Sequence, residues 1–201
     1  MDLQKITVKI FSEERAPVPF ASFIDVFQRW IQESDGIYHD VADYSHINDG
    51  AGILLIARDA NVSIDETGGR RGLLYKQKIP LPGSNAEKLG RVFSKALDYC
   101  RRIETDSALA GRITFPAREA EVTIADRLIA PNTEAAFAAL REELENFTQK
   151  WFHQRPTSVE RRKDPRQCLG LTFRVARPLD LKALARGRTN GSGAIETEGV
   201  Q

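Results

Sequence analysis

One short segment, residues 38–50, contains two of the three histidines, three carboxylates and two tyrosines, and it ends in an Asn-Asp-Gly turn signal. The segment contains two histidines, His39 and His46, and also the carboxylates of Asp40 and Asp43. Aspartate and histidine are ligands for hard or borderline metals, and a carboxylate beside an imidazole suits general-base catalysis. The segment is therefore the first candidate for a small-ligand site, a metal site or a catalytic centre.

Strand geometry limits which of these side chains can act together. On a strand, His39 and Asp43 share one face with Val41, whereas Asp40 points to the other face. Asp43 and His46 converge only if the chain turns between them. The spacing matches no helical metal motif such as H-E-x-x-H, and local turn capping explains the same residues. We take Asp40, Asp43 and His46 as candidate ligand-binding residues, and predict no metal ligand, no catalytic residue and no cofactor.

A second candidate is the glycine-rich stretch 65–72, which places Arg70 and Arg71 beside three glycines. Backbone amides and guanidinium groups of this kind can hold a phosphate. The stretch is neither a Walker A loop nor a dinucleotide fingerprint, because it lacks the Lys-Ser/Thr ending and no helix follows. A hairpin turn that needs positive φ at its glycines is the alternative. We add Arg70 and Arg71 to the candidate ligand-binding residues.

The third candidate is a basic loop at residues 155–166, which follows Trp151 of an expected helix. Its candidate nucleic-acid contacts are Arg161, Arg162, Lys163 and Arg166. Nucleic-acid binders combine such cations with stacking aromatic rings. However, Trp151 continues the apolar stripe of its helix, which favours a core position, and no aromatic RNA-binding motif lies on the expected strands. The pattern therefore disfavours nucleic acid as a partner.

Hydrophobic periodicity predicts the elements that position these groups. Period-two alternation predicts strands at residues 5–11 and 169–175, and residues 52–79 favour an antiparallel meander that begins with a buried strand. Three stretches have the i, i+3, i+4, i+7 spacing of amphipathic helices. They begin at Phe20, after a capping box formed by Ser84 and Glu87, and after a cap at Asn132.

These elements predict an α+β fold in which three amphipathic helices cover one face of a mainly antiparallel sheet. From Gly72 the expected order is strand, helix, strand, strand, helix, strand, which is the split βαβ order of a ferredoxin-like unit. Residues 1–178 are expected to form a single domain. Residues 179–201 are expected to hold a short helical piece and then a disordered tail rich in Gly, Ser, Thr and Glu.

Composition excludes several classes of partner. The 201-residue chain has 29 basic and 28 acidic side chains, so its net charge of +1 provides no global field for nucleic acid or anionic membranes. No run approaches the roughly 18 apolar residues of a membrane span, and the N-terminus lacks a signal-peptide pattern. The widely separated Cys100 and Cys168 do not predict a disulfide framework. We therefore expect a cytoplasmic protein with no membrane contact.

Three phrases resemble a family of conserved bacterial proteins that has no known activity. The phrases are D-V-A-D-Y-x-H, G-R-x-G-L-x-Y and D-R-L-x-A-P-N-T, at residues 40–46, 69–75 and 126–133. After the apolar strand that family has a histidine–glutamate pair, whereas this chain has Arg58-Asp59. The resemblance, over about residues 20–176, implies one intact domain and no particular chemistry.

Nucleophile motifs do not stand out, because G-x-S-x-G is absent and neither cysteine has a histidine beside it in the sequence. We therefore predict an accessory or binding protein that forms a homo-oligomer or binds a protein partner through a sheet edge or a helix face. One alternative is a metal- or small-ligand-dependent enzyme that uses Asp43 and His46 with Arg70 or Arg71. A second alternative is a weak nucleic-acid binder that uses the 155–166 loop.

Overall fold

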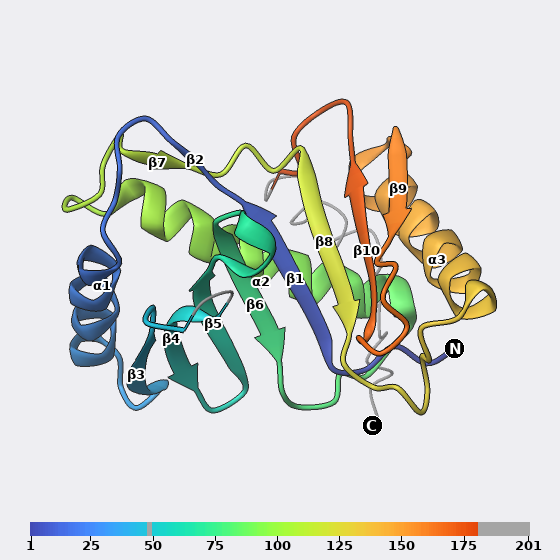
Figure 1. Ribbon diagram of the computed structural model, residues 1–201, viewed down its shortest axis with the longest axis horizontal. Helices are drawn as coiled ribbons and strands as arrows, with labels where there is room; N and C mark the ends of the chain where they lie inside the picture. Colours follow the sequence, from blue (N-terminus) through green and yellow to red (C-terminus); the bar gives the residue numbers. More distant parts are fainter. Residues whose placement is uncertain (48–49, 181–201) are drawn as a thin grey trace, which may run out of the picture.

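The fold is a sheet of strands with helices packed behind it, as Figure 1 shows. The computed structural model describes residues 1–47 and 50–180. Within these ranges there are three α-helices, and the sheet is antiparallel between all neighbouring strands. The predicted α+β class, with a mainly antiparallel sheet, is confirmed.

The bounds of the elements follow the predicted periodicity closely. The helices are α1 (Phe20–Glu33), α2 (Asn85–Thr105) and α3 (Glu134–Phe152), with one 3-10 turn, η1 (Thr67–Gly69). The strands of the main sheet are β1 (Ile6–Phe11), β3 (Tyr38–Tyr44), β4 (Gly52–Ala57), β5 (Ala60–Asp65), β6 (Gly72–Gln77), β8 (Glu119–Ile124), β9 (Ser158–Arg161) and β10 (Leu169–Arg174). Two short strands, β2 (Glu13–Glu14) and β7 (Ile113–Thr114), pair with each other outside it.

The strand order is β3-β4-β5-β6-β1-β8-β10-β9 within the described residues. The N-terminal strand β1 therefore runs through the centre of the sheet, between β6 and β8 (Figure 1). The β4-β5-β6 meander is confirmed. The ferredoxin-like order is not confirmed, because β1 separates β6 from β8 and because β7 leaves the main sheet to pair with β2.

Alternation along β1 divides the sheet into an apolar face and a polar face. Ile6, Val8 and Ile10 are almost fully buried and lie on the face that α2 covers. Thr7 and Lys9 point to the opposite, helix-free face, where both line a hollow. Most of the free energy of burial therefore comes from one side of the sheet, and the other side is left for polar side chains.

Three local features differ from the sequence expectations. The N-cap of α3 is Thr133, whose side chain accepts from the Ala136 amide, whereas the predicted cap Asn132 is buried and binds the chain at residues 162–164. Strand β9 lies inside the predicted basic loop, and its single apolar residue gave no period-two signal. The register of β3 shifts between Tyr38 and Asp40, so the regular alternation expected from His39 to Asp43 is interrupted at His39.

The predicted short helical piece and tail lie outside the described residues, except for Leu179 and Asp180. Leu179 is buried, and its amide donates to the Ala117 carbonyl at 2.9 Å. The capping box of α2 is confirmed in both directions between Ser84 and Glu87. Among the described residues no helix combines the length and the apolar character needed to span a membrane.

A cluster of aromatic rings attaches the β3 edge of the sheet to α1 and α2. The Tyr99 ring of α2 lies 6.0 Å from that of Tyr75 in β6, and its hydroxyl lies 3.1 Å from the Tyr38 hydroxyl. Arg102 donates to the Tyr38 oxygen at 2.6 Å, and its guanidinium lies 3.9 Å from the Trp30 ring centre. Burial raises the pKa of Tyr75 to about 12 and the pKa of Tyr99 still further.

The raised pKa of Tyr75 predicts a loss of stability at high pH. An unfolded chain ionises tyrosine near pH 10, whereas folded Tyr75 ionises at about 12. Its stabilising contribution is therefore complete below about pH 10 and disappears as the pH rises from about 10 to 12. Urea unfolding across that range should show the fall, and Tyr75→Phe should make it shallower. An equal fall in both proteins would contradict the assignment.

Candidate functional site

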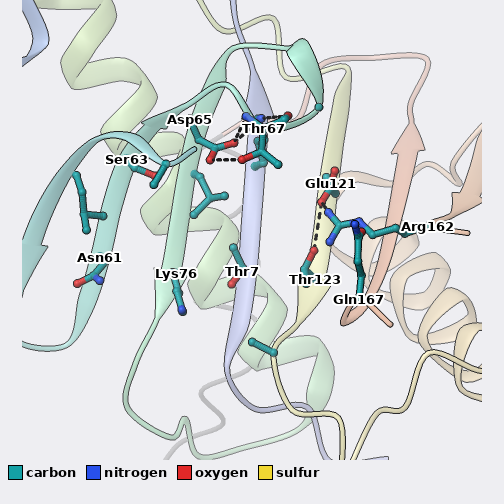
Figure 2. Close-up of a pocket in the computed structure, with 16 residues that line it drawn as sticks. Thr7, Asn61, Ser63, Asp65, Thr67, Lys76, Glu121, Thr123, Arg162 and Gln167 are labelled. Atoms are coloured by element: carbon teal, nitrogen blue, oxygen red, sulfur yellow. Dashed lines mark hydrogen bonds and ion pairs between the residues drawn. The ribbon is translucent and has the colours of Figure 1, made fainter. Parts of the chain in front are cut away.

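The helix-free face of the sheet contains a polar hollow of about 640 Å³ (Figure 2). Its floor is formed by side chains of β5, β6, β1 and β8, and the loop after β9 contributes to one side. The polar lining includes Thr7, Asn61, Ser63, Lys76, Thr123 and Gln167. The hollow is of the size that small-molecule sites usually have, and its lining draws on strands far apart in the sequence.

Strand register explains why these polar groups meet. Asn61 of β5 pairs with Lys76 of β6, Lys76 pairs with Thr7 of β1, and Thr7 pairs with Thr123 of β8. Direct cross-strand partners point to the same face, so these four side chains form one row across the sheet. Neighbouring strands lie about 4.8 Å apart, which gives the row a length of roughly 14 Å.

A buried ion pair closes one end of the hollow. The Lys9 ammonium lies 2.5 Å from an Asp65 oxygen, and each side chain is only 5% exposed. Lys9 also donates to the Thr67 carbonyl at 3.0 Å, while the Thr67 amide and hydroxyl donate to Asp65 at 3.1 and 2.9 Å. These contacts fix η1 against the sheet, and they leave the two opposite charges satisfied by each other.

A second ion pair lies beside the first, between Arg162 of the loop after β9 and Glu121 of β8, which is the direct cross-strand partner of Lys9. The Thr123 hydroxyl donates to the same carboxylate at 3.2 Å. Figure 2 shows Arg162 reaching across to Glu121 and Thr123 beside Gln167. Arg162, a predicted nucleic-acid contact, is therefore part of the wall of the hollow.

One polar atom of the lining residues is buried without a hydrogen-bond partner within residues 1–47 and 50–180. The Asn61 Oδ1 atom is buried and accepts no hydrogen bond from the described chain. Buried polar atoms are almost always hydrogen-bonded, to protein, water or ligand. The Asn61 Oδ1 atom has almost no accessible surface, so a molecule in the hollow does not contact it in this arrangement.

The predicted residues of β3 and its turn do not line the hollow. Asp40, Asp43 and His46 are all exposed at the edge of the sheet. Asp40 accepts from the Val41 amide and Asp43 from the Ser45 amide, both at 2.8 Å. Hydrogen bonds from Ser45 hold the pKa of the Asp43 carboxyl below its usual range. These carboxylates shape the local strand and turn, and the assignment of a ligand to them stays a prediction.

Arg70 is held by β8 and by an aromatic ring. Its guanidinium donates twice to Glu119, at 2.7 and 3.0 Å, and lies 3.7 Å from the centre of the Phe11 ring. The hydrogen bonds from Arg70 keep the pKa of the Glu119 carboxyl below its usual range. A bidentate pair of this kind is among the stronger ionic contacts, so Arg70 has little capacity left for a phosphate.

Arg71 joins three segments of the chain. It forms ion pairs of 2.5 Å with both Glu14 and Glu66, and it donates to the Val18 carbonyl at 2.6 Å. Its guanidinium also lies 4.6 Å from the centre of the Phe20 ring at the start of α1. These contacts connect the β5–β6 turn to the α1 end of the fold, so Arg71 acts as a structural cation.

The other cations of the predicted basic loop are also mostly paired. Arg161 forms an ion pair of 2.5 Å with Glu134, and Arg166 lies 3.3 Å from Asp164. Lys163 is exposed. Binding to nucleic acid gains affinity when free cations release counterions from phosphates, and internal carboxylates reduce that gain here. The nucleic-acid role of these residues stays a prediction with reduced support.

Searches of protein-family models, of curated proteins and of solved structures found no match to this chain. No group of three or more His, Cys, Asp or Glu side chains is placed to hold a metal ion within the described ranges. The function must therefore be argued from the hollow itself. Its alternating polar residues were visible in the sequence at Thr7 and Lys9, but their partners on other strands depend on a register that periodicity alone does not fix.

The buried ion pair gives the first test of this face. Lys9→Met removes one charge and leaves Asp65 unpaired, so we expect a loss of about 3–5 kcal/mol in the free energy of unfolding. Adding Asp65→Asn should recover part of that loss. Lys5→Met is the matched control, because the ion pair of Lys5 with Asp126 is half exposed and should contribute at most about 1 kcal/mol. Urea unfolding of these variants, of Asp65→Asn alone and of the natural protein measures the coupling between Lys9 and Asp65, and equal losses for Lys9→Met and Lys5→Met would contradict it.

Proposed function

We propose that this protein is a binding protein that holds a small polar molecule in the hollow on the open face of its sheet. The observation that supports the proposal is a hollow of about 640 Å³ whose floor carries one row of polar side chains from four strands, Asn61, Lys76, Thr7 and Thr123. Small-molecule sites are concave surfaces of this size in which a few polar groups converge.

The charges around the hollow favour binding over catalysis. General-base catalysis needs a basic group that is free to take a proton. Among the described residues that line the hollow, the carboxylates are Asp65 and Glu121, and each is in an ion pair with Lys9 or Arg162. Histidine and cysteine are absent from that same lining. The arrangement therefore supports recognition of a molecule and not its chemical conversion.

Binding in the hollow can be tested by filling it. Thr7→Tyr places a ring in the row of polar side chains and breaks no hydrogen bond among the described residues. The matched control is Thr172→Tyr, because Thr172 lies on β10 opposite Glu121 of β8, points to the same sheet face and does not line the hollow. We expect polar fragments to shift backbone amide signals of β5, β6, β1 and β8 in NMR spectra of the natural protein and of the control, but not of Thr7→Tyr.

Two results of this experiment would count against the proposal. In the first, no fragment binds at about 1 mM, a concentration that detects weak ligands. In the second, fragments bind but the shifted signals lie on other elements, or they persist in Thr7→Tyr. Circular dichroism of both variants should match that of the natural protein, which separates a filled hollow from a misfolded chain.

A second candidate is a protein partner, or a second copy of this chain, at the β3 edge. Three large apolar side chains are exposed there, Ile37 at 59%, Tyr44 at 39% and Ile47 at 48%. An edge strand offers free backbone groups to a partner strand, and exposed apolar groups strengthen such a contact. This candidate is compatible with ligand binding, because the hollow lies on the sheet face and not at its edge.

Self-association predicts a concentration-dependent mass in sedimentation experiments. We expect the natural chain to sediment as a dimer or larger species at high concentration, and Ile47→Asp to shift it to the monomer. Leu128→Asp is the control, because Leu128 is 97% exposed in the loop after β8, far along the sheet from β3. A natural chain that stays monomeric at about 0.5 mM would remove homo-oligomerisation at this edge.

A further inference from the structure

Strand β3 lies at one end of the main sheet, and within residues 1–47 and 50–180 no strand pairs with its outer edge (Figure 1). It spans seven residues, whereas β9 at the opposite end spans four. Edge strands are normally kept short or carry lysine or proline, which hinders pairing with another chain. Strand β3 contains neither residue, so it presents a ladder of backbone groups that is long enough for a partner strand.

A local hydrogen bond shows which backbone groups of β3 face outward. The Val41 amide donates to the Asp40 carboxylate at 2.8 Å, so this amide is directed away from β4. Backbone groups of alternate residues on a strand point to the same edge. Those of Val41 and Asp43 therefore face outward, and those of Ala42 face β4. An added antiparallel strand must place its own outward residues opposite Val41 and Asp43.

For a second copy of β3, this rule allows two-fold axes at Asp40, Val41, Ala42 or Asp43. Like charges directly opposite each other on paired strands are destabilising. An axis at Asp40 or at Asp43 places two identical carboxylates in that position, which disfavours both. The axes at Val41 and Ala42 remain, and the exposed side chains at the two ends of the strand distinguish them.

Two exposed isoleucines flank β3 at equal distances from Ala42. Ile37 is 59% exposed and Ile47 is 48% exposed, and each lies five residues from Ala42. An axis at Ala42 brings Ile37 of each copy to the end of the strand where Ile47 of the other copy lies, so both apolar side chains are covered. An axis at Val41 would instead place Ile47 beside Asp35. The apolar pattern therefore selects Ala42.

Tyr44 and Asp40 meet across the same axis. Each lies two residues from Ala42, and the three side chains share the open face, because Ala42 pairs with Leu54 of the hollow lining. The Tyr44 hydroxyl is 39% exposed as part of its side chain and has no hydrogen-bond partner among the described residues. Across the axis it lies opposite a carboxylate that can accept its proton in a hydrogen bond.

We infer that β3 pairs antiparallel with β3 of a second copy about a two-fold axis at Ala42. The Val41 amide exchanges its bond to Asp40 for one to the Asp43 carbonyl of the second copy, and the released Asp40 carboxylate accepts from the Tyr44 hydroxyl of that copy. Such an isologous contact closes at two chains, continues the sheet through both and leaves their hollows open on the same side. This inference rests on the second candidate of the proposed function, since it names the partner and the geometry at the same edge.

Disulfide trapping tests the position of the axis. Ala42 meets its own counterpart in a non-hydrogen-bonded pair, where Cα atoms lie about 4.5 Å apart, a distance that a disulfide spans. Val41 lies on a diagonal, roughly 7–8 Å from its counterpart, which is too far. In chains that also carry Cys168→Ser, which leaves only the buried natural Cys100, we expect mild oxidation to give covalent dimers of Ala42→Cys. Val41→Cys and the collision control Leu128→Cys should stay monomeric.

Tyr44→Phe tests the hydrogen bond in the reversible dimer. The substitution removes one hydroxyl from each copy and so removes both symmetry-related bonds to Asp40. We expect the dissociation constant measured by sedimentation to rise by about tenfold or more. Leu128→Asp should leave it unchanged. Circular dichroism of the variants should match that of the natural protein, because Tyr44 and Leu128 are both exposed.

The inference and the contact at this edge fail in different ways. If Ile47→Asp abolishes the dimer but Val41→Cys cross-links in place of Ala42→Cys, the edge is the interface and the inferred axis is wrong. Unchanged affinity in Tyr44→Phe also overturns the inferred register. If neither cysteine variant cross-links more than Leu128→Cys, the two β3 strands are not in contact and the inference falls. A natural chain that stays monomeric at about 0.5 mM removes both the contact and the inference.

Discussion

The position of β1 at the centre of the sheet is the constraint on which both faces of the molecule depend. Val8 faces α2 and is fully buried, whereas Thr7 and Lys9 beside it in the sequence face the open side. Because side chains alternate along a strand, a shift of one residue would place Lys9 in the core and Val8 in water. The register that builds the core is therefore the same register that aligns the polar row, and neither can change alone.

When helices cover only one side of a sheet, the residues on the other side must be stable in contact with water. Apolar residues there would form a large, aggregation-prone surface, whereas charged residues near the centre of the sheet lose part of their hydration. Lys9 and Asp65 resolve this by forming a mutual pair, and Thr67 supplies the remaining hydrogen bonds. These contacts offset the cost of desolvating the two charges locally.

Much of the fold could be predicted from the sequence, because helices and strands with clear periodicity carry their own signal. The capping box of α2 and the β4–β6 meander are examples. The placement of β1 between β6 and β8 could not, since it depends on contacts between distant segments. The residues of the hollow were harder still to predict from the sequence. Thr7 and Thr123 are direct neighbours in space but far apart in the chain, and neither has a distinctive residue type.

Density of charge along the sequence proved a weak guide to the site for a physical reason. Arg70, Arg71 and Arg161 stand out in the sequence, yet each forms an ion pair with a carboxylate from another segment of the chain. Opposite charges that a fold brings together neutralise each other, so the field available to a ligand comes from what remains after pairing. In the lining of the hollow, as far as residues 1–47 and 50–180 show, that remainder is Lys76, on a strand whose sequence gave no functional signal. The charge that a sheet face presents to a ligand is therefore found by removing the ion-paired residues from its list of charged residues.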